Sequence, residues 1–140
     1  MSNEDSVKLN RINLLIGRRG SGKTNAVLRE VIKLKPTHLI YVNDNSFDDT
    51  YMKQHIPIQM TTIKYNEAEE FLTKQHEDIE SDHTIIFFDD AECVFEKKDN
   101  HLLDLLFQKR QPTITYFMCI QNPVSIDLCD KSNFDSIIIM

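Results

Sequence analysis

The sequence has only three glycines among its 140 residues, and all of them, Gly17, Gly20 and Gly22, fall in one short segment. Glycine is favoured where the backbone needs a positive φ or lies directly against a ligand, because it has no Cβ. Because glycine occurs nowhere else in the chain, its presence here indicates a local requirement for such a backbone. We expect this segment to be the site around which the rest of the chain is organised.

Other absences exclude several classes of protein. The longest apolar stretches have the length of strands and the first ten residues are polar, so we expect neither a transmembrane span nor a signal peptide. The cysteines are odd in number and form no C-x-x-C pair, which predicts reduced thiols in a cytosolic protein. The histidines lack metal-ligand spacing. The cysteines are Cys93, Cys119 and Cys129, and the histidines are His38, His55, His76, His83 and His101.

The formal net charge is −6, which argues against a surface that simply coats itself with nucleic acid. It leaves open DNA contact through a few basic loops at the centre of a ring. With 41% hydrophobic residues, a chain of this length suits a single domain with one core. We assign residues 11–140 to this domain and residues 1–10 to a polar lead-in.

Residues 17–24 have the sequence G-R-R-G-S-G-K-T, which matches the phosphate-binding loop G-x-x-x-x-G-K-[ST], or Walker A motif. An apolar, branched stretch at 11–16 precedes the loop, and an apolar stripe at helical spacing follows it, ended by Pro36. The stripe consists of Val27, Leu28, Val31, Ile32 and Leu34. Strand, loop and helix thus occur in the order that the motif requires. The alternative is a glycine-rich turn without a ligand.

The loop predicts a site for a nucleoside triphosphate with Mg²⁺. Successive backbone N–H groups at the N-terminus of the helix can surround the β-phosphate. Lys23 would reach the β- and γ-phosphates, and the Thr24 hydroxyl would ligate Mg²⁺. The residues expected to contact the nucleotide are Gly17, Arg18, Arg19, Gly20, Ser21, Gly22, Lys23, Thr24 and Asn25.

A second chemical signature lies at 83–90, where apolar residues are followed by paired acids. This pattern is typical of a Walker B strand, whose first acid, here Asp89, would hold Mg²⁺ through water. The second acid, Asp90, stands where hydrolytic P-loop proteins place the carboxylate that orients or deprotonates the attacking water. Glu92 is the alternative base if Asp90 points elsewhere. The opposing interpretation is a strand that merely ends in a polar turn.

Further strands are predicted at 37–42 and 135–140, with a brief one at 63–65. The most uniformly apolar and β-prone stretch, 113–120, is expected at the centre of the sheet. Gln121 follows this stretch directly, so we expect it on the ligand side of an open α/β sheet, as a sensor of the γ-phosphate or of water. The alternative is a loop amide that caps backbone groups.

Two more helices are expected. Asn66 resembles a helix N-cap, with Glu69 three residues on as in a capping box. An apolar stripe follows, which consists of Ala68, Phe71, Leu72 and Ile79. A shorter helix with one broad apolar face is predicted at 102–107.

The P-loop, the acid pair, the segment 106–110 before the strand at 113–120, and Gln121 follow one another in an order that resembles the genome-packaging ATPases of large DNA viruses. These are poxvirus-like members of the HerA/FtsK superfamily, and the resemblance extends over residues 12–140. It implies an α/β, RecA-like P-loop NTPase fold. The sheet would be mainly parallel and five-stranded, in the order 5-1-4-3-2, with helices on both faces. The strand that carries Gln121 would lie between the P-loop strand and the Walker B strand.

The resemblance also implies an activity and partners. Proteins of this family are ring-shaped motors, usually hexamers or pentamers, that couple Mg²⁺-dependent ATP hydrolysis to pushing double-stranded DNA into a capsid. The implied partners are ATP, double-stranded DNA, further copies of the chain, and capsid, portal or membrane-vertex proteins. The implied location is the host cytoplasm at the site of virus assembly, or the virion.

The family pattern includes basic residues that act on the transferring phosphate. One arginine precedes the sensor strand, which matches Arg110, and another typically precedes an asparagine near the last strand. Here the corresponding segment is Lys131-Ser132-Asn133. Arginine offers a planar, permanently charged fork, whereas lysine offers a single flexible ammonium group. Either Lys131 does this work less well than an arginine, or Arg110 carries it.

Two other functions are compatible with a P-loop. A small-molecule kinase would transfer the phosphoryl group to a nucleoside, and would be expected to carry an arginine-rich lid. The segment after 113–120 has no arginine, and Gln121 with the acid pair favours water as the acceptor. A nucleotide-binding scaffold would keep the motif without turnover.

Overall fold

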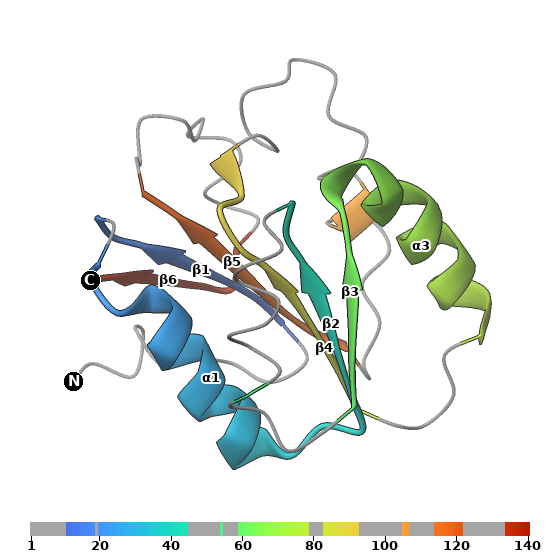
Figure 1. Cartoon of the computed structure of the whole chain (residues 1–140), viewed down its shortest axis with the longest axis horizontal. Coiled ribbons are helices and arrows are strands. Elements are labelled where there is room, and N and C mark those ends of the chain that lie inside the picture. Colours follow the sequence, from blue (N-terminus) through green and yellow to red (C-terminus); the bar gives the residue numbers. More distant parts are fainter. Residues whose placement is uncertain are drawn as a thin grey trace.

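The structure, a computed structural model, describes residues 11–18, 20–44, 54, 59–78, 83–92, 105–106, 114–121 and 134–140, with the backbone alone over 74–78. Its helices and strands are β1 (Ile12–Ile16), α1 (Lys23–Leu34), β2 (His38–Val42), β3 (Met60–Ile63), α3 (Tyr65–Asp78), β4 (Thr84–Phe88), β5 (Ile114–Ile120) and β6 (Ser136–Ile139). Figure 1 shows the strands side by side, with α1 and α3 packed against them.

The described strands form one parallel sheet of six strands in the order β3-β2-β4-β5-β1-β6. The expected order 5-1-4-3-2 corresponds to β6-β1-β5-β4-β2, and this part of the sheet is confirmed. Strand β5 lies between β1 and β4, as expected of the strand that Gln121 follows. The expected number of five strands was too low, because β3 pairs with β2 and extends the sheet by one strand.

The position of β3 also corrects the brief strand expected at 63–65. The strand covers Met60–Ile63, and Tyr65 already belongs to α3. The Tyr65 N–H donates a hydrogen bond of 3.1 Å to the Oδ1 atom of Asp44, just beyond β2. A side-chain oxygen thus satisfies one of the free N–H groups at the start of the helix, which favours helix over strand at this residue.

The start of α3 differs from the expected capping box. The helix begins one residue before Asn66, so that Asn66 lies in the first turn and is not the N-cap. The Lys64 N–H donates a hydrogen bond of 3.2 Å to the Oε1 atom of Glu67. Glu67, rather than Glu69, is therefore the acid that reaches back to the residue before the helix.

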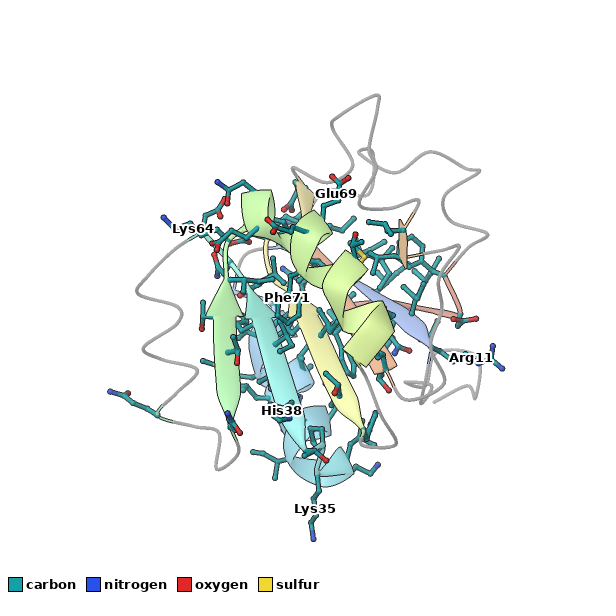
Figure 2. The ribbon with its side chains drawn as sticks, turned by 90° about the vertical axis from the view of Figure 1, so that its right-hand side faces the viewer. Arg11, Lys35, His38, Lys64, Glu69 and Phe71 are labelled. Atoms are coloured by element: carbon teal, nitrogen blue, oxygen red, sulfur yellow. The ribbon has the colours of Figure 1, made fainter. Side chains whose placement is uncertain are left out.

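The helices cover opposite faces of the sheet, as expected. Val27, Leu28 and Val31 of α1 pack in a buried cluster with residues of β1, β2, β4 and β5. Ala68 and Leu72 of α3 belong to a second cluster on the other face, and Phe71 packs against it. Figure 2 shows α3 lying across the strands of this face. Ile79 lies outside the described residues.

Two predicted apolar positions have different outcomes. Ile32 was expected in the buried stripe of α1 but is 49% exposed, because it borders a groove rather than packing on the strands. Leu106, within the short helix expected at 102–107, is helical and fully buried in the cluster on the α3 face. Among the described residues, no helix combines the length and apolar composition needed to cross a membrane.

Candidate functional site

The glycine-rich loop connects the end of β1 to the start of α1. The Gly17 N–H donates a hydrogen bond of 3.1 Å to the carbonyl of Ile120, so the loop leaves the sheet beside the end of β5. Gly20 and Gly22 have φ angles of 83° and 93°. Gly22 is the N-cap of α1, and its carbonyl accepts a 2.9 Å hydrogen bond from the Ala26 N–H. The loop therefore turns sharply and directs α1 away from it.

The glycines of the loop are needed for different reasons. A Cβ on Gly17 would lie 2.6 Å from Ser21 Oγ and 3.2 Å from the Cβ and carbonyl oxygen of Met140. A Cβ on Gly20 or Gly22 would meet no atom within 4 Å. Gly20 and Gly22 are thus required by their positive φ, and Gly17 by the close approach of Ser21 and Met140.

Lys23 places its charge inside the loop. It is 9% exposed, and its Nζ atom donates hydrogen bonds to the carbonyls of Gly17 and Arg18, the latter at 3.1 Å. Arg18 is exposed, Thr24 is half-buried and Asn25 is exposed on the first turn of α1. Arg19 lies outside the described residues. The P-loop side chains that are described therefore gather at one end of α1.

The N-terminus of α1 suits an anion. No side chain of the described residues caps it, and its first turn contains no acid. The Oγ atom of Ser21 is buried in the loop without a hydrogen-bond partner in the described structure. N–H groups without a side-chain cap and a positive helix dipole attract phosphate, and a buried hydroxyl without a partner can donate to it.

Asp89 is the first acid after β4 and is only 7% exposed. Its N–H continues the ladder to β2 with a 3.1 Å hydrogen bond to the carbonyl of Val42. Its Oδ2 atom accepts a hydrogen bond of 2.8 Å from the Tyr41 hydroxyl, and its Oδ1 atom accepts one of 3.0 Å from the Asp90 N–H. The Tyr65 hydroxyl donates to its backbone carbonyl. One hydrogen bond thus holds each oxygen of the carboxylate, and two more hold the backbone of the same residue.

Asp90 and Glu92 have different surroundings. Asp90 is exposed and has a φ of 51°, which few residues other than glycine adopt. Glu92 is half-buried, and its Oε1 atom accepts a hydrogen bond from the N–H of Gln121, directly after β5. The Ala91 N–H bonds the carbonyl of Cys119 at 2.8 Å. The segment after β4 is therefore tied to the end of β5, and Asp90 is exposed beside this connection.

The buried thiol of Cys119 interacts electrostatically with Lys23 of the P-loop and with the acids that follow β4. Burial raises the pKa of this thiol well above its usual value, and the negative charge of Asp89 raises it further. The charge of Lys23 acts in the opposite direction, while Asp90 and Glu92 also raise it. Since Cys119 pairs with Leu15 at the end of β1, the Walker A cation and the acids after β4 lie around the same end of the sheet.

The residues at this end fit a Mg²⁺-nucleotide complex. Mg²⁺ is usually bound by one or two protein oxygens together with substrate phosphates and several waters. Thr24 and Asp89 would supply such oxygens. The described part of the chain has no group of three or more His, Cys, Asp and Glu side chains that could hold a metal ion alone. A metal bound jointly with phosphate is the arrangement for which these residues are suited.

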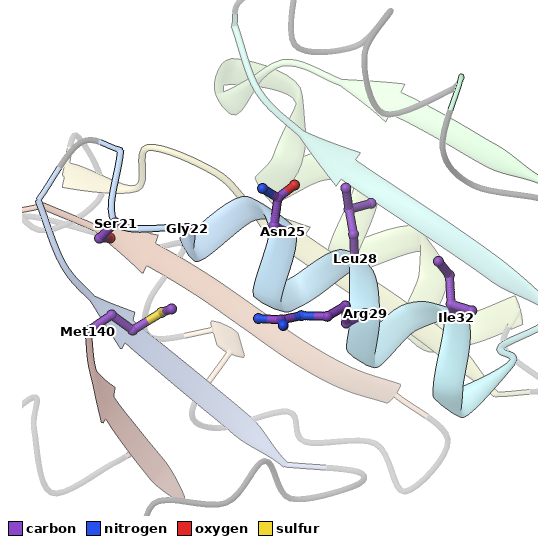
Figure 3. Close-up of a pocket in the computed structure, with 7 residues that line it drawn as sticks. All are labelled: Ser21, Gly22, Asn25, Leu28, Arg29, Ile32 and Met140. Atoms are coloured by element: carbon purple, nitrogen blue, oxygen red, sulfur yellow. The ribbon is translucent and has the colours of Figure 1, made fainter.

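A groove with a volume of about 480 Å³ runs beside the loop, between α1 and the end of the chain after β6. Figure 3 shows the side chains of Arg29 and Met140 approaching each other across it. Its lining residues are Ser21, Gly22, Asn25, Leu28, Arg29, Ile32 and Met140. The groove offers both apolar and polar contacts directly next to the loop that would hold the phosphates.

Some of the predicted site is outside the described residues, and some of the observed site was not predicted. Arg110 and Lys131 both lie in segments that are not described, so their roles stay predictions. Tyr41 and Asn43 were missed. A signal for Tyr41 exists in the sequence, since it is the one aromatic residue in the strand at 37–42, but its partner depends on which strand lies next to it.

No protein-family profile and no curated protein matches the sequence. Solved structures with similar folds do exist. One is EssC (ATPases 2 and 3) from Geobacillus thermodenitrificans, with a TM-score of 0.69 and 12% identity over 93% of this chain and 32% of that one. Another is the assembled ATPase EscN of the type III secretion system of enteropathogenic E. coli, with a TM-score of 0.64 and 8% identity over 93% of this chain and 42% of that one.

A third similar structure is the AAA domain of FIGL-1 in complex with ADP, with a TM-score of 0.57 and 14% identity over 93% of this chain and 42% of that one. At these identities the comparisons show the fold: the chain has the α/β fold of P-loop ATPase domains. It spans about a third to two fifths of the length of these structures.

Proposed function

We propose that the protein is a Mg²⁺-dependent ATPase that hydrolyses ATP to ADP and phosphate. The observation that carries this proposal is the arrangement of Lys23 and Asp89. Lys23 lies inside a P-loop whose helix has no side-chain cap among the described residues, and Asp89 is buried after β4 at the same end of the sheet. A cation for the phosphates and a fixed carboxylate for the metal are the essential parts of a P-loop ATPase.

Each residue has a role in this proposal. The N–H groups of residues 20–24 bind the β-phosphate, and Lys23 contacts the β- and γ-phosphates. Thr24 and, through water, Asp89 would hold Mg²⁺, which would neutralise charge on the phosphates. Asp90 accepts the proton of the attacking water, with Glu92 as the alternative base. Gln121 orients that water from the end of β5.

The finer proposal is that ATP hydrolysis drives double-stranded viral DNA into a capsid. It is supported by the order of motifs along the chain and by the position of β5 between β1 and β4, which the resemblance to genome-packaging ATPases implied. In this proposal the chain acts as a ring of five or six copies in the host cytoplasm or the virion. Arg110 or Lys131 of one copy would contact the nucleotide of the next. DNA and capsid, portal or membrane-vertex proteins would be its partners.

The test is phosphate release from ATP with and without long duplex DNA, with the mass of the protein in solution measured alongside. Release that depends on Mg²⁺ and rises with duplex DNA supports the motor. Mg²⁺-dependent release that DNA leaves unchanged keeps the ATPase but contradicts DNA as its cargo. Turnover that rises only with an added nucleoside indicates a kinase, and tight ATP binding without any release indicates a scaffold.

A further inference from the structure

Tyr41 is a fully buried residue of β2 whose hydroxyl lies between two polar side chains. It donates a hydrogen bond of 2.8 Å to Oδ2 of Asp89 and accepts one of 2.6 Å from Nδ2 of Asn43. An ionised carboxylate can only accept, so the Tyr41 proton must point at Asp89. The Asn43 amide occupies a lone pair of the same hydroxyl and favours this orientation. Asn43 is itself only 6% exposed, so the chain of hydrogen bonds is shielded from water.

The register of the sheet explains why Tyr41 can reach Asp89. Tyr41 pairs with Phe87 of β4, and Asp89 follows two residues later on the same face. The tyrosine side chain is long enough to span this diagonal step to the neighbouring strand, as its hydrogen bond to Asp89 shows. The Tyr41 and Phe87 rings pack with centroids 5.4 Å apart and a tilt of 55°. The ring is therefore held by packing as well as by its hydroxyl.

The hydrogen bonds to Asp89 come from different directions. Oδ2 accepts from Tyr41, and Oδ1 accepts from the Asp90 N–H at 3.0 Å. A donor on each oxygen fixes the rotation of the carboxylate. Each carboxylate oxygen has more than one acceptor site, so a metal-bound water can still be bound.

We propose that Tyr41, oriented by Asn43, is a positioning residue that directs the Asp89 carboxylate toward the Mg²⁺ of the bound nucleotide. This inference rests on the proposed ATPase function. Partners that orient a metal-binding group typically change metal affinity by ~10–100-fold when removed. Tyr41→Phe keeps the ring and its packing on Phe87 and removes only the hydroxyl. We therefore expect it to weaken the Mg²⁺-dependent part of nucleotide binding and to leave the metal-free part unchanged.

The experiment titrates Mg²⁺ at a fixed concentration of a fluorescent ATP analogue, and measures binding of the same analogue in EDTA. Tyr41→Phe should raise the half-saturating Mg²⁺ concentration by ~10-fold without changing affinity in EDTA. Asn43→Ala should also raise the half-saturating Mg²⁺ concentration, by a smaller factor. Tyr116→Phe is the matched control, because Tyr116 is an equally buried tyrosine on the other face whose hydroxyl has no hydrogen-bond partner in the described structure.

The possible results separate the two proposals. An unchanged Mg²⁺ dependence in Tyr41→Phe, or an equal loss of binding with and without Mg²⁺, would overturn the positioning role. If Tyr41→Phe does not fold, the Asn43→Ala titration decides in the same way. Wild-type protein that fails to bind the analogue at any Mg²⁺ concentration would instead overturn the proposed ATPase function, and the role of Tyr41 with it.

Discussion

The N–H of Gln121 donates its hydrogen bond to the carboxylate of Glu92, and this contact joins the end of β5 to the segment after β4. To accept a proton from water, the Glu92 carboxylate would have to give up this structural hydrogen bond. Asp90, two residues earlier, is exposed and its backbone has a positive φ. Strained backbone conformations of this kind concentrate at functional sites. The contrast favours Asp90 over Glu92 as the base.

The first prediction tests this assignment. Asp90→Asn should bind ATP as the wild type does but hydrolyse it ~10²–10⁴-fold more slowly, the usual contribution of a general base. Phosphate release and binding of a fluorescent ATP analogue measure the two effects. Glu92→Gln is the comparison, because its amide oxygen can still accept from the Gln121 N–H. Normal turnover in Asp90→Asn together with lost turnover in Glu92→Gln would assign the base to Glu92.

The second prediction concerns the cation of the loop. Lys23→Ala should abolish binding of ATP, because the ammonium group held at the carbonyls of Gly17 and Arg18 is removed from the phosphate site. Isothermal titration with Mg²⁺-ATP measures the loss. Lys33→Ala is the control, since Lys33 is an exposed cation in the last turn of the same helix. Unchanged ATP affinity in Lys23→Ala would count against the whole assignment of the loop.

The third prediction separates the roles of the glycines. Gly17→Ala should lower both thermal stability and ATP affinity, because its Cβ would lie 2.6 Å from Ser21 Oγ. Ser21→Ala in the same chain removes that oxygen and should restore part of the thermal stability. Gly20→Ala should lower the free energy of unfolding by ~1–2 kcal/mol, because Gly20 has a positive φ. Ser21→Ala should not restore this loss of stability. Thermal melts and nucleotide titrations of the single and double variants check this. Equal rescue of Gly17→Ala and Gly20→Ala would be evidence against the contact.

The fourth prediction concerns stability at the centre of the sheet. Tyr116 is 1% exposed and its hydroxyl has no hydrogen-bond partner in the described structure. Burial raises the pKa of this hydroxyl, so it stays protonated at all ordinary pH values. Burying an unsatisfied polar group costs ~1–3 kcal/mol. Tyr116→Phe should therefore raise the free energy of unfolding by about 1 kcal/mol, measured by denaturant titration. Tyr41→Phe should instead lower the free energy of unfolding, because it loses the hydrogen bond to the Asp89 carboxylate.

Much of the architecture could be predicted because it depends on strong local signals. The strand before the P-loop, the helix after it and the acids at Asp89 and Asp90 are all visible as short patterns, and the resemblance supplied the order of the strands. Strand β3 was placed wrongly because it has four residues at the edge of the sheet, where partial exposure leaves no clear apolar pattern. Ile32 was predicted as buried because helical spacing shows which residues share a face and not how far the sheet extends beneath them.

The contacts of Asp89 could not be predicted for a different reason. Tyr41 is 48 positions away from Asp89 in sequence, and the two residues meet only because β2 and β4 pair in one register. A shift of that register by one residue would turn Tyr41 to the other face of the sheet. Periodicity within a strand contains no information about the register between strands.

The pairing of β1 has a consequence for how the protein folds. Strand β1, from which the P-loop emerges, lies between β5 and β6, and both of these strands come from the far end of the sequence. The hydrogen bonds where the loop leaves β1, from the Gly17 N–H to the Ile120 carbonyl and from the Met140 N–H to the Ile16 carbonyl, join residues separated by most of the chain. Contacts between residues so distant in sequence form slowly, because a long loop must close first. The phosphate-binding loop can therefore reach its native geometry only when β5 and β6 are docked against β1.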